Sequence, residues 1–244
     1  MLSRPELVRH LTDLYAQQLR LTPGDPYTIQ HSQPAVIETQ VTVFEWYRRF
    51  LNQPPGTLLD WGCRHAPDSC LLRATFGDAV TLHAADIDDS DRFVAFHHAA
   101  KLTYSRLDHV YRLPYPDESF DVVLGSGTLE HVAMDYESLK EVYRVLKVGG
   151  RFLITYLPNR WSYEEWWKRE VRKAGAHPRI YSRREMRHML VHHGFRLVTD
   201  GFQTRSDALG GVAWWKRLFV RTTQLHRFTS TICAVAEKVR YING

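Results

Sequence analysis

The strongest constraint on the fold is a change of pattern after the break at residues 52–56, which contains two prolines and a glycine. From residue 57 onward, short apolar runs alternate with segments whose apolar residues recur every three or four positions. The short runs predict buried strands, and the longer period predicts helices. Strands that alternate with helices are typical of a largely parallel sheet, so we predict an α/β fold.

The individual elements can be placed by this pattern and by their end signals. Capping boxes at Ser3 and Ser182 mark the first and last predicted helices, and Gly149 with Gly150 is expected to end a third. Residues 21–34 are expected to form a loop. The expected helices cover residues 3–20, 35–51, 135–147 and 182–193. The expected strands cover residues 57–62, 80–85, a short stretch before Asp108, 120–124, 151–156, 195–204 and 230–239.

Charge is divided unevenly along the chain. Residues 1–150 carry 14 Lys/Arg and 20 Asp/Glu, whereas residues 151–244 carry 18 and 7. A basic C-terminal half suggests an anionic partner, such as an acidic or phosphorylated substrate or a lipid headgroup, although a solvated basic face explains the same charge. No RNA-binding module or basic tail is present, so we expect no nucleic-acid partner.

The expected location follows from cysteine usage and hydropathy. The three cysteines, Cys63, Cys70 and Cys233, have neither disulfide-framework nor zinc-site spacing, which favours a reducing cytoplasm. No apolar run reaches the roughly 18 residues of a spanning helix, and the first residues lack the apolar core of a signal peptide. We expect a cytoplasmic protein, with peripheral membrane contact through its basic, Trp-rich half as a further possibility.

Ligands of a parallel α/β sheet bind beyond the carboxyl ends of its strands. Asp60 and Gly62 follow the first predicted strand, and Asp86 ends the second, in a position that suits hydrogen bonds to ribose hydroxyls. Because acids recur from Asp86 to Asp91, Asp88 is an alternative to Asp86. Asp108 follows the third strand and Gly125 the fourth.

Four segments, residues 58–63, 113–123, 129–132 and 145–151, lie at or near these strand ends in a fixed order. Together they resemble the motifs of class I S-adenosylmethionine (SAM) dependent methyltransferases, and Asp86 matches the ribose-binding acid of that family. The subgroup that they resemble includes quinone-biosynthesis, small-molecule and sugar or glycolipid methyltransferases.

The resemblance implies a Rossmann-like, doubly wound, mostly parallel seven-stranded sheet with an antiparallel last strand. It also implies SAM as cofactor and a helical lid insertion. We expect residues 1–52 to form an N-terminal helical cap and residues 53–244 the methyltransferase core. The residues that the resemblance assigns to the cofactor are Asp60, Gly62, Cys63, Arg64, Asp86, Ile87, Asp108, His109, Gly125 and Ser126.

The loop after the first strand departs from the family pattern. Two of the three glycines expected there are replaced by Arg64 and Ala66. Glycine permits positive φ and close approach of a ligand to the backbone. The replacement therefore implies weaker cofactor binding or a loop of different shape, unless Arg64 pairs with the carboxylate of the cofactor.

Histidines supply the candidate catalytic chemistry. His131, in the motif after the fourth strand, suits a general base for a hydroxyl acceptor, although a structural histidine that bonds its own loop is the alternative. His188 and His192 have helical i, i+4 spacing, but no third ligand is evident, so we expect a solvated face and assign no metal.

Two segments are expected to contact the acceptor, residues 158–180 and residues 205–228. They contain Trp161, Trp166 and Trp214 beside basic residues, a combination that stacks on sugars or lies in a membrane interface. We predict methyl transfer to an oxygen of a sugar, glycolipid or related small molecule. The alternatives are C-methylation of a quinone-like ring, and a SAM-fold binding or scaffold protein without catalysis. The oligomeric state is open.

Overall fold

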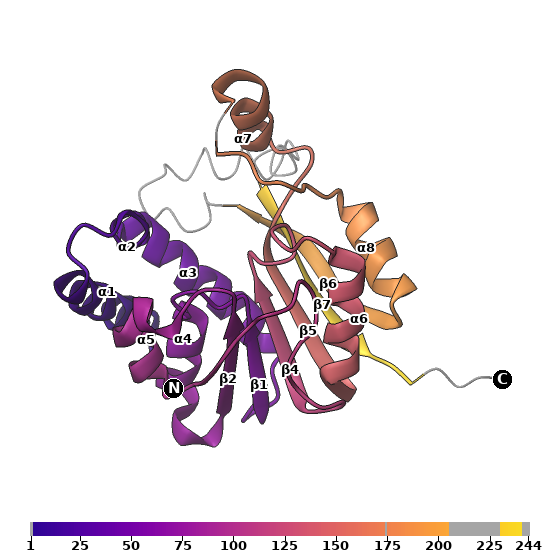
Figure 1. The fold of residues 1–244 in the computed structure, drawn as a ribbon, viewed down its shortest axis with the longest axis horizontal. Helices are drawn as coiled ribbons and strands as arrows, with labels where there is room; N and C mark the ends of the chain where they lie inside the picture. The colour runs from indigo at the N-terminus through magenta and orange to yellow at the C-terminus, as the bar shows by residue number, and fades with distance from the viewer. Residues whose placement is uncertain (1, 174, 205–229, 241–244) are drawn as a thin grey trace. The chain divides into compact units, whose positions relative to one another are not determined.

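The computed structural model describes residues 2–173, 175–204 and 230–240 (Figure 1). The chain divides into two compact units, residues 1–108 and residues 109–244. Each unit is described by itself. The predicted division into a cap of residues 1–52 and a core of residues 53–244 stays a prediction.

The first unit contains a parallel sheet of three strands with helices around it. β1 pairs with β2, and β2 pairs with β3, each in parallel register. The strands are β1 (Thr57–Trp61), β2 (Thr81–Asp86) and β3 (Thr103–Arg106). The helices are α1 (Arg4–Leu21), α2 (Pro26–His31), α3 (Pro34–Tyr47), α4 (Pro67–Phe76) and α5 (Val94–Ala100). Short 3₁₀ turns cover Arg48–Phe50, Gly77–Ala79 and Ser90–Phe93.

Helix α1 forms where its capping box predicts. The Glu6 carboxylate accepts the backbone N–H of Ser3 at 2.7 Å, which satisfies a donor at the helix start. The helix buries Leu7, Leu11 and Tyr15 on one stripe, and it packs against α3, α4 and α5. Burial of this apolar stripe holds the N-terminal helices on the first unit.

Residues 21–34 are not a continuous loop as predicted, because they contain helix α2. The Asp25 carboxylate accepts the backbone N–H of Thr28 at 2.8 Å, and Pro26 occupies the first turn. An acidic N-cap followed by proline is a helix-start signal, which the sequence interpretation missed in so short a segment.

The second unit contains four strands of mixed direction. β4 and β5 are parallel, whereas β7 is antiparallel to both β5 and β6. Helix α6 contacts β5, and α8 contacts β6 (Figure 1). The strands are β4 (Phe120–Ser126), β5 (Leu146–Pro158), β6 (Phe195–Thr204) and β7 (Ser230–Lys238). The helices are α6 (Asp135–Val145), α7 (Tyr163–Trp166) and α8 (Arg183–His192), and a π-helical turn covers Trp167–Arg172.

The end of α6 differs from the prediction. The helix stops at Val145, and Gly149 and Gly150 lie inside strand β5 rather than at a helix end. Leu146 already pairs with Phe120 of β4, so strand pairing begins directly after the last helical residue. A Cβ on Gly150 would lie 2.8 Å from the Lys147 carbonyl oxygen, which explains why this strand position needs glycine.

The described strands number seven in all; they are parallel in the first unit and between β4 and β5, and antiparallel where β7 pairs with β5 and β6. This confirms the predicted Rossmann-like fold class. Among the described residues, no helix combines the length and apolarity that crossing a bilayer requires.

Candidate functional site

The loop after β1 keeps a glycine-like backbone although two glycines are replaced. Gly62, Arg64 and Ala66 have φ values of 70°, 47° and 54°, all in the left-handed region. Non-glycine residues adopt this region at an energetic cost of about 1–2 kcal/mol. The loop therefore takes the conformation that glycine favours without having glycine at two of the three positions.

Hydrogen bonds from neighbouring elements stabilise this conformation. The Asp86 carboxylate, at the end of β2, accepts the backbone N–H of Arg64 at 2.7 Å through Oδ2. Its Oδ1 accepts the backbone N–H of Ile87 at 2.7 Å. On the other side, His97 Nε2 of α5 lies 2.7 Å from the carbonyl oxygen of Arg64. Contacts from β2 and α5 thus hold the strained residue on both sides of its Cα.

The Arg64 side chain is directed toward its own unit. Its Nε lies 3.7 Å from Asp88 Oδ2, and its guanidinium carbon lies 4.7 Å from the centre of the Tyr27 ring. Arg92 also approaches Asp88, with Nη1 3.6 Å from Oδ2. The Arg64 guanidinium thus contacts an acid, Asp88, and the face of an aromatic ring, Tyr27. Its predicted pairing with a cofactor carboxylate stays a prediction.

A buried aromatic cluster packs against the same loop. His65 is buried, with Nε2 2.6 Å from the Tyr15 hydroxyl of α1 and Nδ1 3.1 Å from the Tyr27 hydroxyl of α2. Burial holds the pKa of His65 well below its usual range, so the imidazole is neutral at pH 7. Residue His65 thereby links the N-terminal helices to the loop, a link that the sequence pattern did not predict.

Asp60 is a buried acid with a neutral partner. The Ser69 hydroxyl of α4 donates to its Oδ2 at 2.7 Å. Burial, and then the negative charge of Asp68, raises the pKa of Asp60 to about 8. Asp60 is not the N-cap of α4, because Ala66 occupies that position. A buried carboxyl group that lacks a positive counter-charge favours a cationic ligand.

The acids after β2 differ in their surroundings. Asp86 is the last residue of the strand and is buried, whereas Asp88 is engaged by two arginines. This difference favours Asp86 over Asp88 as the acid that meets a ribose. Ile87 between them is 69% exposed, so it offers an apolar face at the surface.

The two predicted cofactor residues after β3, Asp108 and His109, lie at the surface. His109 Nδ1 accepts the backbone N–H groups of Tyr111 and Arg112 at 3.3 and 3.2 Å. His109 thus orders its own turn. The prediction that this pair lies by an adenine ring stays untested.

The residues of the first unit fit the cofactor that the resemblance implies. SAM carries an ammonium group and a sulfonium, and Asp60 is a buried acid for which the described residues supply no positive partner. The Asp86 carboxylate accepts three backbone N–H groups, those of Arg64, Ile87 and Asp88, and its two oxygens offer about four acceptor positions, so one remains for a ligand. Gly62 and Cys63 complete the loop between these two acids. Asp60 and Asp86 would hold the cofactor if it occupies this site.

In the second unit, the predicted cofactor residues lie at the end of β4. Gly125 is buried, and Ser126 Oγ accepts the Thr155 hydroxyl of β5 at 2.9 Å. Gly127 follows with a positive φ of 66°, and its N–H donates to the Thr155 carbonyl. These bonds fix the turn that leads into residues 128–131.

His131 lies in this turn and is 56% exposed. Its backbone N–H donates to the Thr128 carbonyl, and its Nε2 lies 4.0 Å from Glu130 Oε1. His177, from a distant part of the sequence, is also close, with its ring centre 5.6 Å from that of His131. Sequence analysis did not predict Glu130 or His177 as site residues, because no motif spacing joins them. The stacked rings of His188 and His192 lie elsewhere, on exposed positions of α8.

A basic cavity of about 580 Å³ lies in the second unit. Four arginines contribute to its wall, and Arg160 among them is paired with Glu185 at 2.8 Å. Arg184 is exposed at the surface of α8. The concentration of guanidinium groups favours an anionic ligand. The cavity is lined by Tyr136, Arg160, Arg169, Pro178, Arg179, Ile180, Tyr181, Arg184, Glu185, His188 and Met189.

The predicted acceptor-contacting tryptophans are exposed where they can be described. Trp161 follows β5, and Trp166 ends α7, with its ring 5.7 Å from that of Tyr163 and 6.5 Å from that of Trp167. The exposed rings of Tyr163, Trp166 and Trp167 form an aromatic patch. Trp214 and the segment 205–228 lie outside the described residues.

The comparisons with known proteins identify the family of the chain. The methyltransferase-domain family profile matches residues 37–200. A demethylmenaquinone methyltransferase of Symbiobacterium thermophilum is 30% identical over 118 residues, covering 45% of this chain and 47% of the relative. A fatty-acid O-methyltransferase of Mycolicibacterium smegmatis is 35% identical over 112 residues, covering 45% and 40%. The chain thus spans about half the length, or less, of these curated relatives.

The solved structures extend the likeness to most of the chain. A SAM-dependent methyltransferase of Thermotoga maritima, described as a possible histamine N-methyltransferase, has a TM-score of 0.63 and 16% identity. The match covers 93% of this chain and all of that one, and it shows the fold. With the family profile matched over residues 37–200, the chain belongs to the methyltransferase-domain family, whose class I members use S-adenosylmethionine.

Proposed function

We propose that this chain transfers the methyl group of SAM to an oxygen atom of a small, negatively charged acceptor, such as an acidic or phosphorylated sugar, an anionic glycolipid or a related molecule. The arginine-lined cavity of the second unit carries the anionic part of this proposal. The activity, the acceptor and the partners of the whole protein are all part of the proposal, since the chain spans only part of its curated relatives.

The first unit supplies the proposed cofactor site. The Asp60 carboxylate pairs with the ammonium group of the methionine part, and Asp86 accepts hydrogen bonds from the ribose hydroxyls. The exposed face of Ile87 packs against the adenine. When bound, SAM supplies a methyl group activated by its sulfonium charge.

His131 is the candidate residue for proton removal from a hydroxyl acceptor. Its imidazole is exposed, so an acceptor can reach it, and imidazole is the side chain that most often serves as a general base. The enzyme otherwise contributes alignment of acceptor and methyl group, because the transfer is an in-line displacement. Replacement of His131 by alanine should lower kcat much more than SAM affinity.

Two kinds of acceptor are suggested by the relatives. The fatty-acid O-methyltransferase acts, by its name, on an oxygen of an anionic lipid, which accords with a cavity lined by guanidinium groups. The demethylmenaquinone methyltransferase favours the second candidate, C-methylation of a quinone-like ring. Such a ring carries no full negative charge for the arginines to bind, so we favour the anionic oxygen acceptor.

The scaffold alternative rests on the two missing glycines. Because Arg64 and Ala66 adopt the left-handed backbone of the glycines that they replace, the loop has the conformation that a cofactor loop needs. This observation supports a working cofactor site.

The first experiment is calorimetric titration of the protein with SAM and, separately, with its demethylated product. Micromolar binding of both supports the cofactor site, and absence of binding to either contradicts the proposal. Release of the demethylated product is then measured with three acceptor classes: a fatty acid, a sugar phosphate and a demethylated quinone. Turnover with the quinone alone would replace the anionic acceptor by the ring acceptor.

The cavity can be tested in the same assay. Arg184→Ala should raise KM for an anionic acceptor at least about tenfold, which corresponds to about 1.4 kcal/mol. Arg196→Ala is the matched control, because Arg196 pairs with Glu237 at the surface and does not line the cavity. Equal KM values for wild type and Arg184→Ala would place the acceptor elsewhere.

A further inference from the structure

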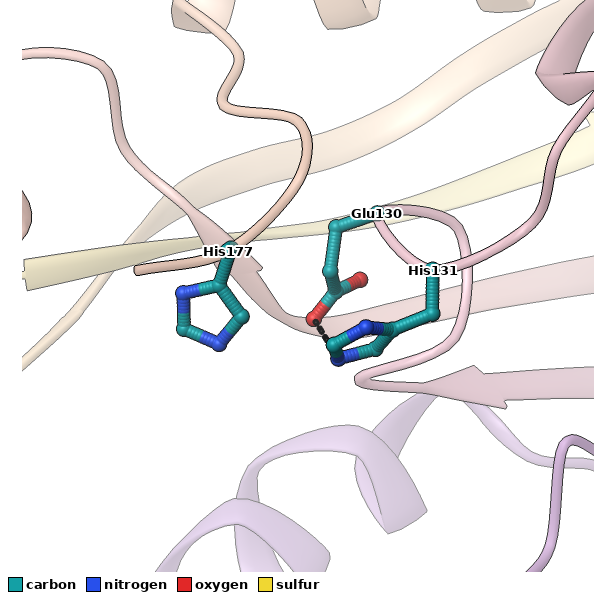
Figure 2. A group of neighbouring side chains, drawn as sticks. All are labelled: Glu130, His131 and His177. Carbon is teal, nitrogen blue, oxygen red and sulfur yellow. Dashed lines mark ion pairs between the residues drawn. The ribbon is translucent and has the colours of Figure 1, made fainter. Parts of the chain in front are cut away.

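Three side chains of the second unit converge although they come from separate segments of the chain. Glu130 and His131 follow β4, whereas His177 precedes α8. Each can offer one ligand atom, and these atoms all lie within 4.8 Å of one another. Figure 2 shows the Glu130 carboxylate between the two imidazole rings.

Glu130 has an unsatisfied carboxylate oxygen. The residue is buried, and its Oε2 has no hydrogen-bond partner among the described residues. Its other oxygen, Oε1, lies 4.0 Å from His131 Nε2. Removing a carboxylate from water without full pairing is costly, and a bound cation would compensate for this cost.

His177 is oriented by a second carboxylate. Its Nδ1 lies 2.9 Å from Glu165 Oε1, so Nε2 is the nitrogen left for a ligand. Glu165 is itself anchored by Lys168, whose Nζ lies 3.1 Å from Oε1. A carboxylate that holds one nitrogen of a metal-binding histidine is the usual outer-shell arrangement of such sites.

The type of ligand indicates the class of metal. Two imidazoles and one carboxylate are the ligands of catalytic zinc sites and of other divalent transition-metal sites with open positions. Calcium and magnesium prefer oxygen ligands, so they suit this set less well. Ligand atoms about 2 Å from a shared zinc ion lie a little over 3 Å apart, so the side chains have to move closer than the 4.0 Å between Glu130 and His131 and the 4.8 Å limit of the whole set.

The surroundings leave room for a further ligand. His131 is exposed, so the set is open to solvent on its side. Two residues connect the set to the arginine-lined cavity. Arg169 donates to the His177 carbonyl, and Pro178 follows His177 in the chain; both residues line the cavity. A metal held by these side chains could therefore take an oxygen atom of a bound molecule as a further ligand.

We propose that Glu130, His131 and His177 form a binding site for a divalent transition metal of the zinc class, with an open position for water or an oxygen ligand. Glu165 is a positioning residue that orients His177. Metal binding can be measured without SAM or acceptor, so this inference is tested separately from the proposed methyl transfer. A metal bound to His131 occupies the basic nitrogen of the imidazole, so it would replace the proposed role of His131 as a base.

Cobalt is the probe, because its visible absorption reports protein ligands directly. Full-length protein treated with a chelator is titrated with Co²⁺, and the bound cobalt is then displaced with Zn²⁺. We expect one equivalent of Co²⁺ per chain and loss of the absorption band when Zn²⁺ is added. Wild-type protein that shows no saturable band overturns the proposal.

Variants identify the ligands. Glu130→Gln and His177→Ala should each weaken Co²⁺ binding at least tenfold, and Glu165→Gln should weaken it less. His131→Ala should weaken Co²⁺ binding as well. It is the variant least expected to disturb folding, because the His131 side chain is exposed. Circular dichroism of each variant verifies that it is folded.

The matched control is His192→Ala. His188 and His192 stack on α8 at a ring separation of 6.2 Å and could bind a stray metal as a pair. We expect this variant to bind Co²⁺ as the wild type does. If it loses the band while Glu130→Gln and His131→Ala keep it, the metal binds on α8 and the proposed site is wrong.

Discussion

Asp86 at the end of β2 accepts the backbone N–H of Arg64 at 2.7 Å. One carboxylate thus fixes a left-handed residue in the loop after β1 and lies where the family resemblance expects a ribose acid. The loop shape therefore depends on this side chain, and under the proposed function SAM recognition depends on it as well.

Asp86→Asn should weaken SAM binding at least about tenfold, or about 1.4 kcal/mol, because an amide has one acceptor oxygen where the carboxylate has two. Calorimetric titration measures the change. Asp89→Asn is the matched control, since Asp89 pairs with Arg106 at the surface. If Asp88→Asn weakens binding and Asp86→Asn does not, the ribose acid lies two residues further on.

Arg64→Gly should leave SAM affinity within about threefold of wild type, a difference of about 0.7 kcal/mol. The backbone of residue 64 already has a φ of 47°, so glycine keeps the loop conformation. Binding by the glycine variant together with no binding by the wild type would instead show that the Arg64 side chain blocks the site.

The pKa of Asp60 predicts how stability depends on pH. Burial and Asp68 raise this pKa from 3.8 to about 8, so the folded protein retains a proton that the unfolded chain releases. The contribution of Asp60 to the free energy of unfolding should therefore decrease as pH rises from about 4 to 8.

Urea denaturation at several pH values measures this dependence. Asp60→Asn keeps the shape and removes the titration, so its free energy of unfolding should fall less over the same pH range. Parallel curves for the two proteins would show that the folded-state pKa of Asp60 is not raised.

Asp200 should stabilise the second unit. Its side chain is buried between Arg183 and Arg187 of α8, and Arg187 Nε lies 2.8 Å from Oδ2. The arginines hold the pKa of Asp200 below its usual value even though burial opposes them. Its stabilising contribution is therefore present above the unfolded pKa and is lost as pH falls through the folded pKa.

Asp200→Asn should lower the free energy of unfolding at pH 7 by about 1–3 kcal/mol, because both arginines lose their counter-charge. Urea denaturation measures the difference. Glu237→Gln serves as the control, since Glu237 pairs with an exposed Arg196 and should change stability by less than about 1 kcal/mol.

The aromatic patch of Tyr163, Trp166 and Trp167 lies in one of the two Trp-rich, basic segments from which membrane contact is predicted. We expect flotation with anionic vesicles at low salt and reduced flotation at high salt, because salt screens the basic residues. Trp166→Ala should reduce the bound fraction, whereas Val191→Ala, at another exposed apolar position, should not. Failure to float at low salt would contradict membrane contact.

Most of the secondary structure was predictable from the sequence because its causes are local. The capping boxes at Ser3 and Ser182 place two helix starts, and apolar runs place the strands. The predictions failed where distant pairing decided the outcome. Leu146 joins β5 through its pairing with Phe120, so α6 ends earlier than its own periodicity indicates.

The sequence by itself determined the fold class, the family and the acids at the strand ends, because motif spacing and hydrophobic periodicity depend only on residues that are near one another in the chain. Only the tertiary structure decided that Arg64 takes a glycine-like backbone, since the bond that holds it comes from Asp86 on another strand. It alone brings Glu130 beside His177, because chain folding, and not spacing, places those residues together. Contacts between distant residues carry no local pattern, which is why sequence analysis could not predict them.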